Sequence, residues 1–232
     1  MIRSVPAAAA AALLLALPAA AEEAPPPPWL MTGANTVTVA VTWNEAAVGA
    51  LLPEGVVPAA DLSGGVNVYR TEGGYGFGPY ESAYAYVNVE GWDSASGAPA
   101  RYILGGWYGP DPKVAAAMRR RFGAAVETGE SAQRAEGEDW IGEGGDGTGA
   151  IRVRVTPGGD CVPAAGTLNY VAPAAPGLGL GLLKIPFEGA FCPAAPVSVE
   201  IDAPEGSPMA RLEATSMLGG GQLKDGTFSF GK

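Results

Sequence analysis

The chain has 232 residues, of which 47% are apolar and only 16% are charged, and it contains 35 glycines and 21 prolines. This composition is too apolar for a disordered chain and too rich in turn-forming residues for a helical bundle. Histidine is absent, which excludes Ser-His-Asp and Cys-His catalysis and His-ligated zinc, and two cysteines cannot form a four-thiolate metal site. We therefore predict neither a metal nor another cofactor. The formal net charge of −10 makes nucleic acids and anionic membrane surfaces unsuitable partners.

The first residues have the pattern of a secretory signal peptide. Arg3 precedes an unbroken apolar stretch, residues 5–21, which ends in alanines that match an A-x-A cleavage site. The charge cluster that would stop transfer of a membrane-spanning segment does not follow it. We expect a signal peptide over residues 1–21, a proline-rich segment over 22–35 and one domain over 36–232. The mature protein is expected to be exported, periplasmic or secreted, and free of the membrane.

From residue 36 onward, apolar and polar residues alternate in short runs. In the first run Val37, Val39 and Val41 lie on one face of a strand, whereas Thr36 and Thr38 lie on the other. Further runs, separated by Gly, Pro, Asp and Ser turns, occupy residues 66–68, 83–89, 103–107, 151–155 and 197–201. Many short strands at this spacing predict a mainly β protein, an antiparallel β-barrel that is closed or partly open.

One short helix is expected to interrupt the strands. Asp111 can cap its N-terminus, Pro112 suits the first helical position, and Gly123 suits the end. The apolar residues between them repeat at helical spacing: Val114, Met118 and Phe122.

Cys161 and Cys192 are the only cysteines, and 30 residues lie between them. An oxidising compartment would pair them, and neither belongs to a C-x-x-C motif that would suggest a reactive thiolate. We predict a structural disulfide, which would stabilise the fold by about 3–4 kcal/mol in the chain-entropy model.

The glycine-rich and acidic stretch 136–149 permits two functional interpretations. Gly142, Gly144 and Gly147 fit the spacing G-x-G-x-x-G, but no strand-to-helix unit surrounds them, and the acidic residues do not have the spacing of an EF-hand loop. We instead predict a solvated hairpin that turns at Asp146-Gly147.

Four short motifs together resemble the acetoacetate decarboxylase family. They are Leu51-Leu52-Pro53-Glu54-Gly55, Gly76-Phe77-Gly78-Pro79-Tyr80-Glu81-Ser82, Leu183-Lys184-Ile185-Pro186 and Leu223-Lys224-Asp225-Gly226. Their order and spacing match over most of the chain after the signal segment. The resemblance implies a β-barrel-like fold whose interior holds a small carbonyl compound, commonly in a homo-oligomer.

The resemblance also implies a reaction, and two of its three key residues are missing. The family uses a lysine after a short helix, whose neutral amine attacks a ketone, with an arginine on the first strand and a glutamate in a Tyr-x-Glu-Ser segment. Here alignment on Gly123 places Val126 and Glu127 where lysines are expected, and the arginine position falls near Thr42. Glu81 remains, although one residue is missing between the tyrosine and this glutamate.

Glu81 and Lys184 are the candidate catalytic residues. Glu81 shares strand parity with Ala83 and Ala85, so it would be a proton-transferring acid if that face lines the interior, or a solvated carboxylate if it lies at a strand end. Lys184 shares parity with Leu182 and could point into an apolar space, or its stem could lie along the surface with its ammonium in water.

Tyr80, Glu81 and Trp107 are the candidate ligand-binding residues. Trp107 precedes the helix and could form the wall of a pocket, although an aromatic residue is more commonly part of the core. Our main hypothesis is an exported, divergent member of this family that has lost lysine-dependent decarboxylation and binds a small apolar ligand with a keto or carboxylate group. The alternative is a carbon-carbon lyase or aldolase-type enzyme with Lys184 as Schiff-base residue and Glu81 as acid and base. A third possibility is a structural or assembly role for the tyrosine-rich face.

Overall fold

The computed structural model describes residues 25–93, 97–174 and 178–231, so the expected signal peptide lies outside the described residues. Within these residues the chain is mainly β, as predicted. Its elements are β1 (Trp29–Trp43), α1 (Glu45–Leu51), β2 (Ser63–Arg70), β3 (Gly73–Tyr75), β4 (Glu81–Val89), β5 (Ala100–Gly109), α2 (Pro112–Phe122), β6 (Val126–Thr128), β7 (Glu130–Glu136), β8 (Asp139–Gly145), β9 (Ala150–Pro157), β10 (Val162–Pro173), β11 (Leu180–Asp202), the 3-10 helix η1 (Pro208–Arg211) and β12 (Ala214–Phe230).

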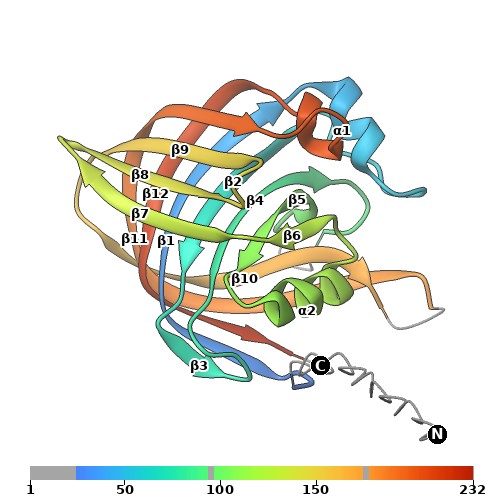
Figure 1. Ribbon diagram of the computed structural model, residues 1–232, viewed down its shortest axis with the longest axis horizontal. Helices are drawn as coiled ribbons and strands as arrows, with labels where there is room; N and C mark the ends of the chain where they lie inside the picture. The colour runs from blue at the N-terminus through green and yellow to red at the C-terminus, as the bar shows by residue number, and fades with distance from the viewer. Residues whose placement is uncertain (1–24, 94–96, 175–177, 232) are drawn as a thin grey trace, which may run out of the picture.

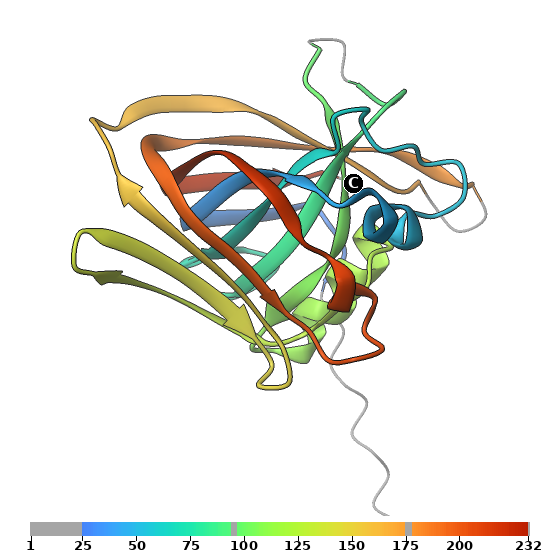
Figure 2. The same ribbon diagram turned by 90° about the horizontal axis from the view of Figure 1, so that it is seen from above.

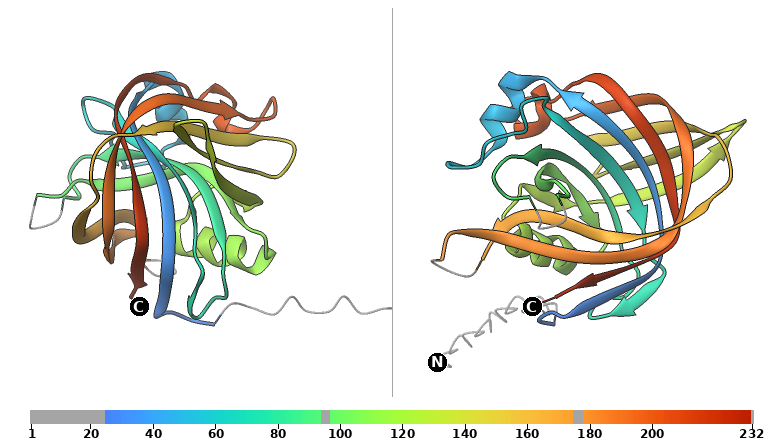
Figure 3. Two further views of the ribbon diagram at one scale, coloured as in Figure 1. Left: turned by 90° about the vertical axis from the view of Figure 1, so that its left-hand side faces the viewer. Right: turned by 180° about the vertical axis from the view of Figure 1, so that it is seen from behind.

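One sheet contains all the strands, and its two ends fold onto opposite faces of its centre (Figure 1). The strand order is β10-β5-β4-β2-β1-β12-β11-β9-β8-β7, and an additional pairing of β10 with β11 closes a ring of seven strands. The long, curved β11 makes this possible, because its first half pairs with β10 and its second half pairs with β9 (Figure 3). Strands β9, β8 and β7 then pack over the other face of β1, β2 and β4.

The central strands are buried on both faces, and each face belongs to a different hydrophobic cluster. We call the first the valine cluster; its buried members are Val37, Val39, Val41, Trp43, Ala47, Val48, Val56, Val66, Val68, Ala83, Ala85, Val87, Val89, Ala100, Tyr102, Leu104, Trp107, Ile151, Val153, Val155, Val171, Met209 and Leu212. We call the second the tyrosine cluster; its buried members are Trp29, Met31, Tyr69, Phe77, Tyr80, Tyr84, Tyr86, Ile103, Tyr108, Val114, Ala115, Ala117, Met118, Phe122, Ala124, Val126, Tyr170, Ile185 and Phe230.

The expected helix is confirmed as α2. The Asp111 carboxylate accepts a hydrogen bond from the Lys113 backbone N–H at 3.0 Å, Pro112 starts the helix, and Gly123 ends it in the left-handed region at φ 66°. In Figures 1 and 2 the β7–β8 hairpin points away from α2. The Phe122 side chain packs in the tyrosine cluster and so anchors the end of α2 there.

The expectation of a single helix is wrong, because α1 forms a second one in the described part of the chain. Its seven residues are too few to show a helical repeat of apolar positions in the sequence. The helix stops before Pro53, since the residue preceding a proline is driven into extended backbone, and Leu52 has φ −82° and ψ 139°. The sheet also contains two parallel pairings, β5 with β6 and β5 with β10, besides the expected antiparallel ones. Helix α2 is the crossover that brings β6 parallel to β5.

The first strand starts earlier than the alternation indicates, at Trp29 instead of residue 36. Gly33 adopts φ 61°, and the pairing of β1 with β12 shifts between Met31 and Ala34. This irregularity interrupts the alternation of apolar residues, so the sequence pattern hides the first part of the strand.

The hairpin expected at Asp146-Gly147 is confirmed between β8 and β9, where the Asp146 carboxylate accepts hydrogen bonds from the backbone N–H groups of Thr148 and Gly149. The preceding glycines allow close packing: a Cβ atom at Gly144 would lie only 2.6 Å from that of Ala83, and one at Gly142 would lie 2.8 Å from that of Val68. They therefore let β8 approach β2 and β4.

The predicted disulfide between Cys161 and Cys192 is confirmed, and it joins the start of β10 to β11. Among the described residues, the helices are all too short or too polar to cross a lipid bilayer.

Candidate functional site

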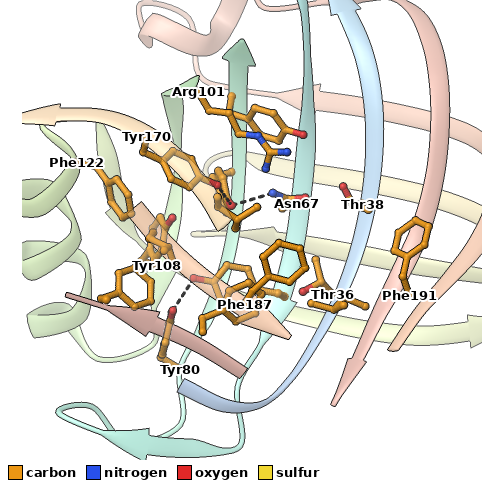
Figure 4. Close-up of a pocket in the computed structure, with 18 residues that line it drawn as sticks. Thr36, Thr38, Asn67, Tyr80, Arg101, Tyr108, Phe122, Tyr170, Phe187 and Phe191 are labelled. Atoms are coloured by element: carbon orange, nitrogen blue, oxygen red, sulfur yellow. Dashed lines mark hydrogen bonds between the residues drawn. The ribbon is translucent and has the colours of Figure 1, made fainter. Parts of the chain in front are cut away.

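A cavity of about 190 Å³ lies inside the ring of strands (Figure 4). Six tyrosines and five phenylalanines dominate its lining, with four polar or charged residues and three aliphatic ones. The lining residues are Thr36, Thr38, Asn67, Tyr69, Tyr80, Tyr84, Tyr86, Arg101, Tyr108, Phe122, Leu168, Tyr170, Ile185, Phe187, Phe191, Leu223, Phe228 and Phe230.

Strand alternation determines which residues face the cavity. On β1 the threonine face, Thr36 and Thr38, lines it, while the valine face packs under β9. On β4, Tyr84 and Tyr86 line the cavity, whereas Ala83 points to the opposite face and belongs to the valine cluster. The tyrosine-rich face noted in the sequence is therefore the wall of the cavity.

The tyrosine hydroxyls form two small hydrogen-bonded groups. The Asn67 side-chain amide donates to the Tyr84 hydroxyl at 2.8 Å, and the hydroxyls of Tyr84 and Tyr170 share a hydrogen bond at 2.8 Å. In the other group the hydroxyls of Tyr69 and Tyr80 lie 2.6 Å apart. These bonds fix the orientation of the rings, because a buried phenol without a partner would be costly.

Burial keeps five of the six cavity tyrosines neutral at physiological pH. Burial away from water raises the pKa of Tyr69, Tyr84 and Tyr108 well above the ordinary value, because it disfavours the phenolate, and it also raises the pKa of Tyr80 and Tyr86. These phenols can therefore donate and accept hydrogen bonds, but they supply neither a negative charge nor a strong acid.

Arg101, at the start of β5, carries the only charge of the described cavity lining. Its guanidinium lies over the Tyr86 ring, 4.6 Å from the ring centroid, which is cation–π geometry. Burial lowers the pKa of Arg101, but interactions with Tyr86, Tyr170 and Tyr84 outweigh burial and hold that pKa above its ordinary value. In the described parts of the chain, each ion pair involves other residues, so Arg101 has no carboxylate partner there.

Thr36 adds a second polar group without a partner. Its Oγ1 atom is buried and makes no hydrogen bond to the described residues. Since Thr36 lines the cavity, its hydroxyl is available to a molecule that enters the cavity.

The residues predicted for the site lie in different places. Tyr80 lines the cavity. Glu81 begins β4 on the opposite face, where its carboxylate accepts a hydrogen bond of 2.7 Å from the Ser131 backbone N–H of β7. The face that Glu81 shares with Ala83 and Ala85 thus belongs to the valine cluster and not to the cavity.

Lys184 and Trp107 also lie outside the cavity lining. Lys184 is exposed on β11, and its neighbour Ile185 faces the cavity instead. Trp107 is buried in the valine cluster. The structure therefore does not bring Glu81, Lys184 and Trp107 together around the cavity.

The positions aligned with the family's lysines carry no amine. After Gly123, Val126 starts β6 beside Gly106 of β5, and its side chain is fully buried in the tyrosine cluster. The Glu127 side chain is exposed and lies 3.6 Å from Arg119. An isopropyl group thus stands in the buried position, and a carboxylate in the exposed one.

Sequence reasoning missed Arg101 and Asn67. Each is a polar residue within an otherwise apolar run, Ala100-Arg101-Tyr102-Ile103-Leu104 and Val66-Asn67-Val68. A polar residue in such a run that keeps strand parity with buried aromatic positions is the signal that could have found them.

Comparison with solved structures identifies the fold. An acetoacetate decarboxylase from Legionella pneumophila subsp. pneumophila str. Philadelphia 1 matches with a TM-score of 0.69 at 14% identity, covering 94% of this chain and 91% of that one. The enduracididine biosynthesis enzyme MppR complexed with pyruvate matches with a TM-score of 0.66 at 13% identity, covering 89% and 90%. An acetoacetate decarboxylase-like enzyme from Sphingomonas wittichii RW1 matches with a TM-score of 0.61 at 15% identity, covering 96% and 98%.

No family sequence model and no curated protein sequence matches the chain. The structural matches cover nearly all of both chains, so the chain has the acetoacetate decarboxylase-like fold, and the fold expected from its sequence motifs is confirmed. At 13–15% identity the structural similarity establishes the fold alone, so any function has to be inferred from the residues of the cavity.

Proposed function

We propose that the protein binds a small organic carboxylate in the cavity, that Arg101 holds its anionic group, and that lysine-dependent decarboxylation has been lost. The observation that carries this proposal is Arg101, a partly buried guanidinium without a carboxylate partner among the described residues. The Tyr86 ring stabilises this cation in part, and a compensating anion and hydrogen bonds would stabilise it further. A bound carboxylate would supply both, since guanidinium and carboxylate match in bidentate geometry.

The lining residues support binding more than lysine-based catalysis. A Schiff base needs an amine that can reach the ligand's carbonyl carbon. Lys113, Lys184 and Lys224 are described, and none lines the cavity, while Val126 takes the position aligned with the family's lysine. Without the amine, no iminium can accept the electrons released when carbon dioxide leaves.

The lyase alternative has no observation in its favour. Lys184 is exposed, and Glu81 accepts its hydrogen bond on the face of β4 opposite the cavity. A shared ligand would have to contact both residues, which lie outside the cavity lining in the described chain.

Calorimetric titration with acetoacetate, butyrate and benzoate tests the proposal. We expect at least one of them to bind, acetoacetate to release carbon dioxide no faster than in buffer, and borohydride treatment to leave no reduced lysine adduct. The variant Arg101→Gln should lower affinity about 10- to 100-fold, which corresponds to a charged hydrogen bond of about 1.5–3 kcal/mol.

Arg119→Gln is the matched control, because this arginine is exposed on α2 and pairs only with Glu127 among the described residues. Its affinity should equal that of the wild type, and circular dichroism should show that Arg101→Gln is folded. If folded Arg101→Gln binds as tightly as the wild type, or if a lysine adduct forms with acetoacetate, the proposal is wrong.

We also propose that the protein is exported. The disulfide between Cys161 and Cys192 supports this, since such bonds persist in oxidising compartments, and so does the signal-peptide pattern of residues 1–21. N-terminal sequencing of the protein recovered outside the cytoplasm should begin at Glu22. Recovery of the chain in the cytoplasm with residues 1–21 retained would contradict export.

A further inference from the structure

The ligand's charge can be deduced from the charges around the cavity. Arg101 is the single charged residue of the described lining, which contains no Asp, Glu or Lys. One carboxylate would neutralise it. A second carboxylate on the same ligand would be removed from water without a cation to pair with, which is strongly unfavourable. The cavity therefore suits a monoanion.

The ligand's surface can be deduced from the rings that surround it. Eleven of the eighteen lining side chains are aromatic, against three aliphatic ones. Phe187 lies in the middle of the group, between Arg101 and Tyr80 (Figure 4), and it stacks on Phe228 with the ring centroids 6.1 Å apart and the planes at 26°. A flat ring can stack on such walls or meet them edge to face, which adds about 0.5–1.5 kcal/mol beyond the area buried.

The ligand's second polar group can be deduced from the hydrogen-bond count. In the pair Tyr69 and Tyr80, one hydroxyl hydrogen lies between the two oxygens, so the other is not used in that bond. The pair Tyr84 and Tyr170 likewise keeps one hydrogen, because Asn67 donates to it with its own amide. Each group can therefore donate to a neutral acceptor, such as a hydroxyl, ether or carbonyl oxygen on the ligand.

The size of the cavity limits the ligand to a small molecule. Sites for drug-sized ligands measure about 300–1,000 Å³. The cavity here has about 190 Å³. One ring with a carboxylate and a small substituent is the scale that such a volume indicates.

We propose that the cavity selects small aromatic monocarboxylates, with the carboxylate at Arg101 and the ring against Phe187 and the tyrosines. A neutral oxygen on the far side of the ring would meet the hydroxyl pair of Tyr69 and Tyr80, because Tyr80 lies away from Arg101 in the lining (Figure 4). This inference rests on the proposed function, because it presupposes that Arg101 holds a carboxylate. Beyond the proposed function, it specifies that the carboxylate is aromatic and carries a single negative charge.

The test compares ligands that differ in one property. Benzoate and cyclohexanecarboxylate have the same charge and a similar size, but only benzoate is aromatic. By calorimetric titration, we expect benzoate to bind about 2- to 12-fold more tightly. Terephthalate, with a second carboxylate, should bind at least tenfold more weakly than benzoate, and 4-hydroxybenzoate should bind at least as tightly.

Phe187→Leu should bring the benzoate and cyclohexanecarboxylate affinities close together, because it removes the ring at the centre of the lining. Phe77→Leu is the control, since Phe77 belongs to the tyrosine cluster but does not line the cavity, and it should keep the wild-type ratio. If cyclohexanecarboxylate or terephthalate binds as tightly as benzoate, the inference is wrong while the proposed function stands. If folded protein binds no carboxylate, the proposed function itself fails.

Discussion

The same central strands bury two faces, and the two faces are built from different side chains. On β1 the valine cluster receives Val37, Val39 and Val41, all fully buried, whereas the cavity receives Thr36 and Thr38. Short aliphatic side chains and glycines let β8 pack directly on this sheet, so the valine cluster is close-packed. Long aromatic side chains that are tied together by their hydroxyls leave a cavity on the other face.

This difference separates stability from function within one sheet. The valine cluster is built from close-packed apolar side chains, and the removal of atoms from it costs packing energy. The tyrosine cluster borders a cavity whose lining includes a cation and a threonine hydroxyl without a hydrogen-bond partner among the described residues. Each of the following predictions tests whether the two faces behave as differently as they are built.

Alkaline pH should unfold the protein, and this is the largest effect we expect. Burial raises the pKa of Tyr69, Tyr84 and Tyr108 well above the ordinary value near 10, so the folded protein keeps protons that the unfolded chain releases. Stability is therefore complete below about pH 10 and falls above it, by about 1.4 kcal/mol per pH unit for each such phenol. Absorbance at 295 nm should rise together with the loss of circular dichroism; ionisation of most tyrosines near pH 10 in a folded protein would contradict the account.

Equal truncations on the two faces should have unequal costs. Ile151 is fully buried in the valine cluster, and Ile185 is 2% exposed but faces the cavity. Ile151→Ala should reduce the free energy of unfolding by about 2–5 kcal/mol, and Ile185→Ala by at least about 1 kcal/mol less, because its side chain already borders empty space. Urea titration of both variants measures the difference. Equal losses would mean that the cavity wall is packed as tightly as the core.

Loss of the disulfide should affect the cavity side. The loop that Cys161 and Cys192 close carries five residues of the cavity lining: Leu168, Tyr170, Ile185, Phe187 and Phe191. The double variant Cys161→Ser and Cys192→Ser should lose about 3 kcal/mol of stability. It should also bind benzoate more weakly at a temperature where it remains folded. Unchanged stability and unchanged binding would show that the strand pairing alone holds this wall.

A single methyl group should disturb the close-packed face. Gly144→Ala would place a Cβ atom 2.6 Å from that of Ala83, so we expect a loss of about 1–3 kcal/mol from overpacking. Gly219→Ala is the matched control on strand β12, because nothing lies within 4 Å of the added atom. Thermal unfolding of both variants checks this. A Gly144→Ala protein as stable as the control would mean that β8 can move away from β4 without cost.

Local patterns predicted the elements, but not which face carries the site. Asp111, Pro112 and Gly123 located α2 because caps act within a few residues. The alternation of β4 also located its two faces, yet both are buried, and only the distant closure of β10 on β11 and the packing of β7 decide which one borders the cavity. For this reason parity alone cannot decide between the two positions open to Glu81, and the structure places Tyr80, but not Glu81, in the cavity lining; a role for either residue in a site stays a prediction.

A crystal structure of the protein with bound benzoate tests the central claim most directly. We expect the carboxylate within hydrogen-bond distance, about 2.7–3.0 Å, of the Arg101 guanidinium, with the ring inside the cavity between Phe187 and the tyrosines. Benzoate bound elsewhere, or bound in the cavity with its carboxylate away from Arg101, would contradict it.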